Sequence, residues 1–457
     1  MEKVRGKQYR EEPGEVEVET QKSLVYWTSG DLDLREQLEE LRAAIDRASA
    51  RADARVQRES GYFEKVVGPK TEPLRPGRVE DLIAGEIVET ASGKHFETTK
   101  LYPRHQRHGS YEISALEELP HDLLDALSDG AIGKVHPRKW AFLDTETTGL
   151  AGGSGTCAFL IGLGSIEDEG FLVRQFFMRD HAEEASALDA LTKHLARFEV
   201  LVTYNGKSYD QPLLETRYTM CRKRHPFSKM EHLDLLYGAR RLFKLRLENC
   251  RLVNLETQIL GVERHGDIPG EMIPYVYFEY LRTKRGHRLV PVFEHNVLDI
   301  VSLACLTGVI PEAFRDPENA RARHGIDLLG LARWLQVSGR LEEAHKLMRR
   351  AVDMGLPDAQ LFRTLFETGG IEKKLGWLDA SVATFEDLTA SRNAYQVKAY
   401  EELAKHYEHK TRNNALALEC VVAARCIEDS EALAARQLRL ERKAAGKPKQ
   451  RGLSLGA

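Results

Sequence analysis

The chain has 457 residues, of which 42% are hydrophobic and 30% are charged, and its formal net charge is −4 at pH 7. The length suggests about three domains, and the composition is that of a soluble globular protein. Because its net charge is slightly negative, the chain as a whole is not a basic nucleic-acid-binding protein. The N-terminus lacks a signal-peptide pattern, and no apolar run approaches the length of a membrane span. We therefore expect a cytoplasmic protein that does not contact a membrane.

The six cysteines are scattered without any Cys-x-x-Cys pair, so neither a disulfide framework nor a zinc ribbon is indicated. Cys221, His225 and His232 are an alternative zinc cluster, but their spacing fits no familiar site.

Residues 1–137 carry only weak patterns. Residues 1–30 are charged and aperiodic, which predicts a disordered tail. The following segment, residues 31–137, is expected to form an N-terminal extension. Its leucines at helical spacing between residues 31 and 60 predict an amphipathic helix that docks on its own protein, with a coiled coil as the alternative. Residues 87–90 and 96–102 then predict a β-hairpin that turns around Gly93.

Two histidines, His105 and His108, follow this hairpin beside Arg104 and Arg107. They are either contacts for nucleic acid or ordinary loop residues, and the second interpretation is slightly favoured.

The strongest pattern begins at residue 140, where an apolar run ends in Asp144 and Glu146 before a Thr-Thr-Gly turn. Its length is typical of a short buried strand, in which residues i and i+2 share a face. Both carboxylates should therefore point the same way. Two like charges at a strand end repel each other unless a cation lies between them, and a hard divalent cation prefers oxygen ligands. We interpret this pair as half of a metal site.

Two later segments carry matching polar residues. Residues 200–204 predict a strand that ends in an Asn-Gly turn, and the helix after it has Asp210 in its first turn. Further on, His295 and Asp299 lie four residues apart on a predicted helix, so one is stacked above the other. The opposite face of that helix is apolar. The polar pair should therefore face a site outside the core.

The elements between these segments indicate the sheet. Residues 157–163 and 171–177 predict two strands that follow the first through tight turns, which implies an antiparallel start. Strands that alternate with helices come next. We expect an α/β domain over residues 138–312, with a mixed sheet flanked by helices.

The motif order Asp-x-Glu, Asn-x-x-x-Tyr-Asp and His-x-x-x-Asp resembles that of the DEDD exonuclease superfamily, which has the ribonuclease H-like fold. Asp234, residues 249–256 and the Gly-Asp-Ile-Pro-Gly run at residues 266–270 look like the bacterial YprB-type branch. The resemblance is close over about residues 138–310 and looser in the flanks.

This resemblance implies a metal-dependent 3′–5′ exonuclease. Asp144, Glu146, Asp210 and Asp299 would bind two Mg²⁺ or Mn²⁺ ions, and His295 would activate water. The histidine stands four residues before the last aspartate, which is the spacing of the tyrosine subclass, whereas the histidine subclass usually has five. Two divalent ions about 4 Å apart can activate a water and stabilise a leaving oxygen, so no protein nucleophile is required. Further candidates for substrate contacts are Thr147, Asn205, Lys207, Tyr209 and Asn296.

Basic residues are grouped near these motifs, at residues 222–224, 240–246 and 282–288. A local basic track beside an acidic metal centre would suit a phosphate backbone. The alternative is that each run is an ordinary solvated helix face.

Beyond Pro311 the pattern is only helical. Helical hairpins are predicted around Gly339, Gly376 and Asn413, and the small residues Ala344, Ser381 and Ala415 recur 37 and then 34 residues apart. This period is close to the roughly 34 residues of a tetratricopeptide repeat, with a plain helical bundle as the alternative. We expect repeats of this type over residues 325–438 and a disordered basic tail over residues 439–457.

Two functions are consistent with these patterns. In the first, the chain is an exonuclease whose helical repeats hold substrate or a partner. In the second, it is an inactive nuclease-fold scaffold whose repeats bind a protein or nucleic-acid partner. The complete set of four carboxylates and the histidine favours the enzyme. YprB-like proteins are associated with DNA repair and a helicase partner, so the resemblance favours DNA over RNA.

Overall fold

The computed structural model describes residues 77–128, 130–149, 155–319 and 324–445. The predicted N-terminal tail and the helix between residues 31 and 60 lie outside the described residues.

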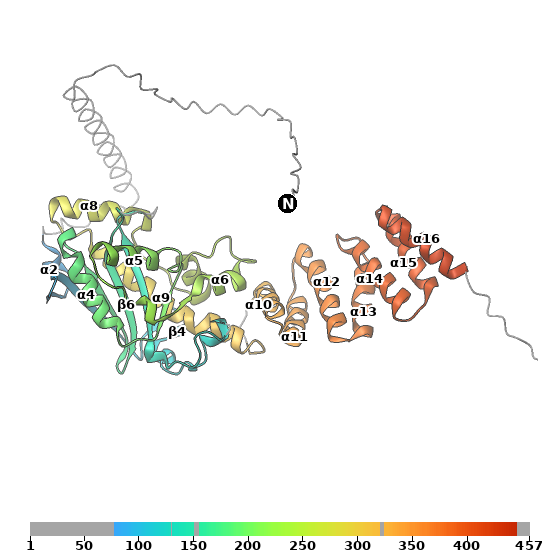
Figure 1. Cartoon of the computed structure of the whole chain (residues 1–457), viewed down its shortest axis with the longest axis horizontal. Helices are drawn as coiled ribbons and strands as arrows, with labels where there is room; N and C mark the ends of the chain where they lie inside the picture. Colours follow the sequence, from blue (N-terminus) through green and yellow to red (C-terminus); the bar gives the residue numbers. More distant parts are fainter. Residues whose placement is uncertain (1–76, 129, 150–154, 320–323, 446–457) are drawn as a thin grey trace, which may run out of the picture. The chain divides into compact units, whose positions relative to one another are not determined.

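A seven-stranded mixed sheet forms the centre of the fold, in the order β1-β2-β7-β6-β5-β8-β9 (Figure 1). Its strands β5, β6 and β7 are antiparallel neighbours as predicted, while β8 pairs in parallel with β5 and β9 with β8. The sheet is flanked by helices, which confirms the predicted fold class. The strands are β1 (Glu86–Thr90), β2 (Gly93–Pro103), β5 (Trp140–Thr147), β6 (Ala158–Glu167), β7 (Gly170–Phe177), β8 (Val200–Thr203) and β9 (Glu231–Asp234).

The N-terminal hairpin is part of this sheet. Strands β1 and β2 turn at Gly93 as predicted, but β2 also pairs with β7, from Phe96 opposite Phe177 to Pro103 opposite Gly170. A two-stranded sheet follows, formed by β3 (Arg107–His108) and β4 (Tyr111–Glu112). The expected boundary at residue 138 is therefore wrong for the hairpin, because the backbone groups of β2 find their partners in a strand that lies far along the chain.

Helix α9 (Val290–Arg315) is the central helix of the core. By length and composition alone it could cross a membrane, which corrects the expectation that the chain has no such segment. However, 72% of its apolar 18-residue window is buried inside the protein, as in the core helix of a globular domain. The other helices around the sheet are α2 (Val79–Leu82), α3 (Asp125–Ser128), α4 (Glu184–Leu195), α5 (Asp210–Met220), α6 (Leu235–Phe243), α7 (Leu252–Leu255) and α8 (Ile273–Thr283).

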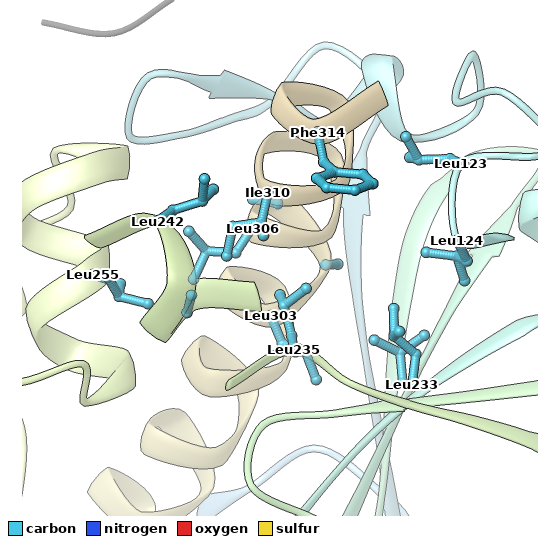
Figure 2. Close-up of a cluster of buried hydrophobic side chains, with 14 of the residues drawn as sticks. Leu123, Leu124, Leu233, Leu235, Leu242, Leu255, Leu303, Leu306, Ile310 and Phe314 are labelled. Carbon is cyan, nitrogen blue, oxygen red and sulfur yellow. The ribbon is translucent and has the colours of Figure 1, made fainter. Parts of the chain in front are cut away.

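The hydrophobic core gathers side chains from segments that are far apart in the sequence. In Figure 2, Leu306 of α9 lies near Leu242 of α6, while Phe314 of α9 lies toward Leu123 in the loop before α3. Each buried leucine contributes about 1.5–3 kcal/mol relative to its exposed state. The position of α9 is thus determined by packing along its whole length.

Two glycines let α9 approach strand β6 closely. A Cβ atom on Gly162 would overlap side-chain atoms of Ile300 and Asn296, and one on Gly164 would overlap Ile300 and Phe171. Gly162 is directly opposite Asp144 in the β5–β6 ladder. The missing side chains therefore bring α9 next to the carboxylates of β5.

The C-terminal part is all helical, and the three predicted hairpins are present (Figure 1). The small-residue period is corrected in the third pair, since Ala415 is exposed and Ala417 is buried at the fourth position of its helix, as Ala344 and Ser381 are in theirs. The helices are α10 (Gly325–Val337), α11 (Leu341–Asp353), α12 (Asp358–Leu375), α13 (Leu378–Thr389), α14 (Gln396–His409), α15 (Asn414–Ile427) and α16 (Glu431–Ala445). The corrected spacings are 37 and 36 residues.

Helix α16 also corrects the predicted tail. Residues 439–445 are helical, and Arg439 and Lys443 donate hydrogen bonds to Glu408 of α14 at 2.8 and 2.7 Å. A run of basic residues is compatible with a helix when a buried carboxylate accepts from it. Residues 446–457 lie outside the described residues.

The first helices of the C-terminal part share the core of the sheet domain. Asp327 of α10 accepts hydrogen bonds from Arg246 at 2.9 and 3.0 Å, and Gly330 lies against the backbone of Leu242. Trp334 packs against Phe314 of α9, with ring centroids 4.4 Å apart. The expected domain boundary between residues 312 and 325 therefore marks a change from mixed to helical secondary structure, but the same hydrophobic core lies on both sides of it.

Candidate active site

Asp144 and Glu146 lie on the same side of β5, where Asp144 faces α9. The side-chain amide of Asn296 donates to Asp144 Oδ2 at 2.8 Å, and Gln175 donates to Asn296 Oδ1 at 2.9 Å. Asn296 is 0% exposed. The expectation that Asn296 contacts substrate is therefore corrected, because its side chain is fully buried and holds Asp144 instead.

Asp210 begins α5 and is held beside β5. The hydroxyl of Thr145 donates to its carboxylate. The turn before α5 is fastened by Asp234, which accepts from the backbone N–H groups of Asn205 and Lys207 at 2.8 and 3.1 Å. Asn205 has a φ of 67°, a left-handed conformation that asparagine tolerates better than most residues. Asp234 thus positions Asp210 through the turn.

The remaining substrate candidates lie at the same end of the sheet. Asn205 and Lys207 are exposed on the turn. Thr147 is buried, and its hydroxyl contacts that of Tyr209 at 2.9 Å, while both hydroxyls donate to the backbone oxygen of Gly149. These two side chains therefore stabilise the chain after β5 as well as lining the region.

Helix α9 brings His295 and Asp299 to this end, with His295 Nε2 3.6 Å from Asp299 Oδ2. Three further residues, Glu256, Arg264 and Asp267, were missed as site residues by sequence reasoning. Arg264 donates to Asp299, to Glu256 and to Asp267, and Asp267 also contacts His295. The sequence offered two signals for them, namely the run at residues 249–256, which ends in Glu256, and the Gly-Asp-Ile-Pro-Gly run, which contains Asp267.

Burial and mutual repulsion raise the pKa values of the carboxyl groups. The pKa of Asp144 is well above its usual range, first because of burial and then because of the charges on Asp299, Glu146 and Asp210. Burial also raises the pKa of Glu146 to about 8 and that of Asp210 to about 6. These groups act on one another electrostatically, so the side chains from β5, α5 and α9 form one cluster.

The pKa of His295 is raised to about 9. Burial lowers it, but the hydrogen bond to Asp267 and the charges of Asp299 and Glu146 outweigh burial. The imidazole is therefore protonated at neutral pH unless positive charge enters the cluster.

Within the described residues, Asp144, Glu146 and Asp210 have no ion pair with lysine or arginine. An unpaired buried carboxylate is costly, and a cation is the usual compensation. The all-oxygen donor set suits Mg²⁺ or Mn²⁺. The same part of the chain contains no preassembled group of three or more His, Cys, Asp or Glu side chains that could hold a metal, so the donor chemistry fits but the ligand cluster is not closed.

Several members of the expected basic track are engaged in protein contacts. Lys223 is bonded to Asp189, Arg246 to Asp327 and Arg288 to Glu279. Arg241 stacks over Trp334 at 5.2 Å. These cations stabilise the fold, so fewer residues of the expected basic track are available for other contacts than the sequence suggested.

The alternative zinc cluster does not form. Both ring nitrogens of His232 are hydrogen bonded, to Thr203 and to Gln211, and Cys221 lies 3.6 Å from a carboxylate oxygen of Glu184. His108 is buried in strand β3 and contacts Ser302 at 2.6 Å, so it is a structural residue of that strand, which corrects its interpretation as a loop residue.

Comparison with known proteins agrees with this architecture. The RNase H superfamily matches residues 141–310. An uncharacterised protein of Bacillus subtilis (strain 168), YprB, is 31% identical over 343 residues, which cover 74% of this chain and 81% of that protein. A family B DNA polymerase from the hyperthermophilic archaeon Pyrobaculum calidifontis matches 44% of this chain and 29% of its own at 15% identity, and its TM-score of 0.29 is too low to bear on fold or function. The chain therefore belongs to the YprB-like family of proteins with a ribonuclease H-like domain.

Proposed function

We propose that the protein is a metal-dependent 3′–5′ exonuclease that hydrolyses phosphodiester bonds of nucleic acid, with DNA as its substrate. The observation that carries this proposal is the cluster of buried Glu146 and Asp210 with partly buried Asp144, none of which forms an ion pair with lysine or arginine among the described residues, next to Asp299 and His295. The repulsion within such a cluster destabilises the fold unless bound cations offset it, and clusters of this kind are typical of functional sites. The RNase H superfamily match covers all five residues.

Asp144, Glu146, Asp210 and Asp299 would hold two divalent cations. Bound there, Mg²⁺ or Mn²⁺ would supply the positive charge that activates water and stabilises the leaving 3′ oxygen. The residues of the chain do the rest. Asn296 keeps Asp144 in place, and His295 accepts the proton of the attacking water once added positive charge has lowered its pKa from about 9.

The decisive experiment is digestion of end-labelled single- and double-stranded DNA and RNA with Mg²⁺ or Mn²⁺. We expect stepwise shortening from the 3′ end, greater on DNA, which stops on chelation of the metal. Full activity in excess chelator would contradict the metal mechanism, and the absence of cleavage of all four substrates with either metal would contradict the proposed activity. Shortening from the 5′ end would contradict the polarity alone.

The C-terminal helices would hold the substrate strand. A cavity of about 300 Å³ lined by residues of α12, α13, α14 and α16 has Lys373 and Lys405, both paired with Glu402, together with Arg436 and Lys410 in its lining. If Lys410 contacts a phosphate, Lys410→Glu should weaken DNA binding and reduce the salt dependence of the affinity by about one ion, without changing kcat. Lys398→Glu, at an exposed position on α14, is the matched control, since Lys410 directly follows the end of that helix. Equal affinities of both variants would assign these helices a structural role and leave a protein partner to be tested.

A further inference from the structure

Arg264 is a buried cation at the edge of the carboxylate cluster. Its side chain is only 4% exposed. It donates to Glu256 Oε2 at 2.7 Å, to Asp267 Oδ2 at 3.0 Å and to Asp299 Oδ1. Three carboxylates around one guanidinium use most of its donors, so its orientation is determined by bonds on several sides.

Asp267 lies between Arg264 and His295. Its two carboxylate oxygens are 2.9 and 3.0 Å from His295 Nδ1, while His295 Nε2 is directed toward Asp299. The guanidinium of Arg264 is also near Nδ1, at 3.4 Å. The carboxylate contacts are shorter and charge-assisted, so Nδ1 carries a hydrogen that it donates to Asp267.

The loop that supplies Arg264 and Asp267 is well anchored. It starts after Gly261 and passes Gly266, with φ values of 70° and 74°, a conformation that favours glycine. Glu256, which holds Arg264, is 0% exposed. The backbone N–H of Ser110 in the hairpin between β3 and β4 donates to Leu260 at 2.7 Å. The loop can therefore hold a side chain in a defined position.

We propose that Asp267 is a positioning residue that orients His295, and that Arg264 holds Asp267 and Asp299 at a constant separation. This inference rests on the proposed function. With Nδ1–H bonded to Asp267, the neutral ring presents the lone pair of Nε2 to the cluster. As the water oxygen bonds to phosphorus, one O–H bond of the water breaks and its proton moves to Nε2. The bond between phosphorus and the 3′ oxygen breaks with its electron pair on that oxygen, which takes up a proton to become the new 3′-hydroxyl.

Asp267→Asn is the sharpest test because the structure predicts how the amide will sit. Arg264 donates to Oδ2 of Asp267, so the amide oxygen of the variant should take that position and its NH₂ should take the position of Oδ1, 2.9 Å from Nδ1. The NH₂ cannot accept from Nδ1–H, and the neutral amide no longer stabilises the protonated ring, so the ring is held less firmly and is a weaker base. We expect kcat to fall about 10²–10⁴-fold with KM little changed, as for loss of a general base.

A double-mutant cycle separates orientation from general structural support. In a His295→Ala background, Asp267→Asn should cause almost no further loss of kcat, because there is no ring left to orient. Independent losses would indicate a role that does not act through His295. Asp267→Glu keeps the charge and should retain more activity than Asp267→Asn. Mn²⁺ affinity, measured by titration calorimetry, should change less than kcat in every variant.

Asp327→Asn is the matched control, since Asp327 also accepts from an arginine but lies on α10. It should leave kcat unchanged. If the wild type cleaves DNA and Asp267→Asn cleaves it equally fast, the positioning role is wrong and the nuclease proposal stands. If the wild type cleaves no nucleic acid, the proposed function fails and the inference fails with it.

Discussion

Asp144 combines three environments that are rarely found together on one carboxylate. It is desolvated, it is surrounded by like charges, and a buried amide from Asn296 holds it in place. The first two raise its pKa and destabilise the charged form, while the third fixes its direction. This combination costs stability in the absence of a cation, which is typical of functional sites.

Asp144→Asn should therefore separate function from stability. We expect kcat to fall at least about 10²-fold, a loss typical of removing one group that stabilises the transition state. The metal-free variant should be at least as stable as the wild type, because one of several mutually repelling carboxyl groups is gone and Asn296 keeps an oxygen to which it can donate.

Thermal melts with and without Mn²⁺ measure both effects. Mn²⁺ should raise the Tm of the wild type more than that of Asp144→Asn, because a ligand stabilises the state that binds it. Asp168→Asn, at an exposed position, serves as the control. Equal Mn²⁺-induced shifts in the wild type and Asp144→Asn would exclude Asp144 as a metal ligand.

Two elements, β6 and α9, determine how closely the carboxylates approach. At Gly162 the two elements are in close contact, since a Cβ atom there would overlap Ile300 and Asn296. The positions of the functional side chains of α9 therefore depend on the absence of a side chain at Gly162.

Gly162→Ala should push α9 away from β6. Overpacking of this kind costs about 1–3 kcal/mol of unfolding free energy, and we expect kcat to fall together with stability because Asn296 moves with the helix. The control is Gly370→Ala in α12, where nothing lies within 4 Å of the added methyl group. This substitution should stabilise the helix by about 0.5–1 kcal/mol. Urea unfolding measures the stability of both variants, and a cleavage assay measures their kcat. Unchanged activity in Gly162→Ala would show that α9 tolerates the displacement.

Helices α14 and α16 are joined through Glu408, which accepts from Arg439 and Lys443. Burial acts against the charged form of Glu408, but these hydrogen bonds outweigh it and lower its pKa to about 2. The folded-state pKa lies below the usual value of 4.5, so the charged form stabilises the fold above pH 4.5. This contribution decreases as the pH falls from 4.5 to about 2.

Glu408→Gln should thus destabilise the protein at pH 7 by about 1–3 kcal/mol, the range for hydrogen bonds to a charged group. The difference from the wild type should shrink between pH 4.5 and pH 2. Denaturant unfolding followed by circular dichroism measures this difference, with Glu419→Gln on the exposed face of α15 as the control. A difference that is the same at pH 7 and pH 2.5 would contradict the role of the charge.

At the scale of the whole molecule, the core does not end where the sheet ends. Helices α10 and α11 contribute Leu328, Trp334 and Met348 to the same buried cluster as α6 and α9. The later helices have two smaller clusters of their own. A boundary between hydrophobic cores therefore lies among the later helices. It does not lie where the mixed sheet gives way to helices.

This division predicts how truncations behave. A chain that ends at residue 326 should lose several kcal/mol of stability or aggregate, because the apolar side of α6 becomes exposed. A chain that ends at residue 392 keeps α10–α13 and should retain cleavage with a Tm close to that of the full chain. Thermal melts and cleavage of a short oligonucleotide by both truncated proteins measure this. Equal stability of the two would indicate that α10 only touches the sheet domain.

The sequence by itself determined the features that follow from backbone periodicity. The two-residue repeat of a strand placed Asp144 and Glu146 on one side, and the helical repeat stacked His295 on Asp299. Tight turns predicted the antiparallel order of β5, β6 and β7 and the hairpin at Gly93. These are local rules, so one segment is enough to apply them.

Only the tertiary structure decided which distant groups meet. The partners Arg264 and Asp299, or Asp144 and Asn296, belong to segments with no shared periodicity, and the contacts exist because α9 packs closely on β6. The pairing of β2 with β7 and the ion pair of Arg246 with Asp327 have the same origin. A buried polar group must find a partner, but which partner it finds depends on the packing of the whole core, and that information is not contained in the spacing of any one motif.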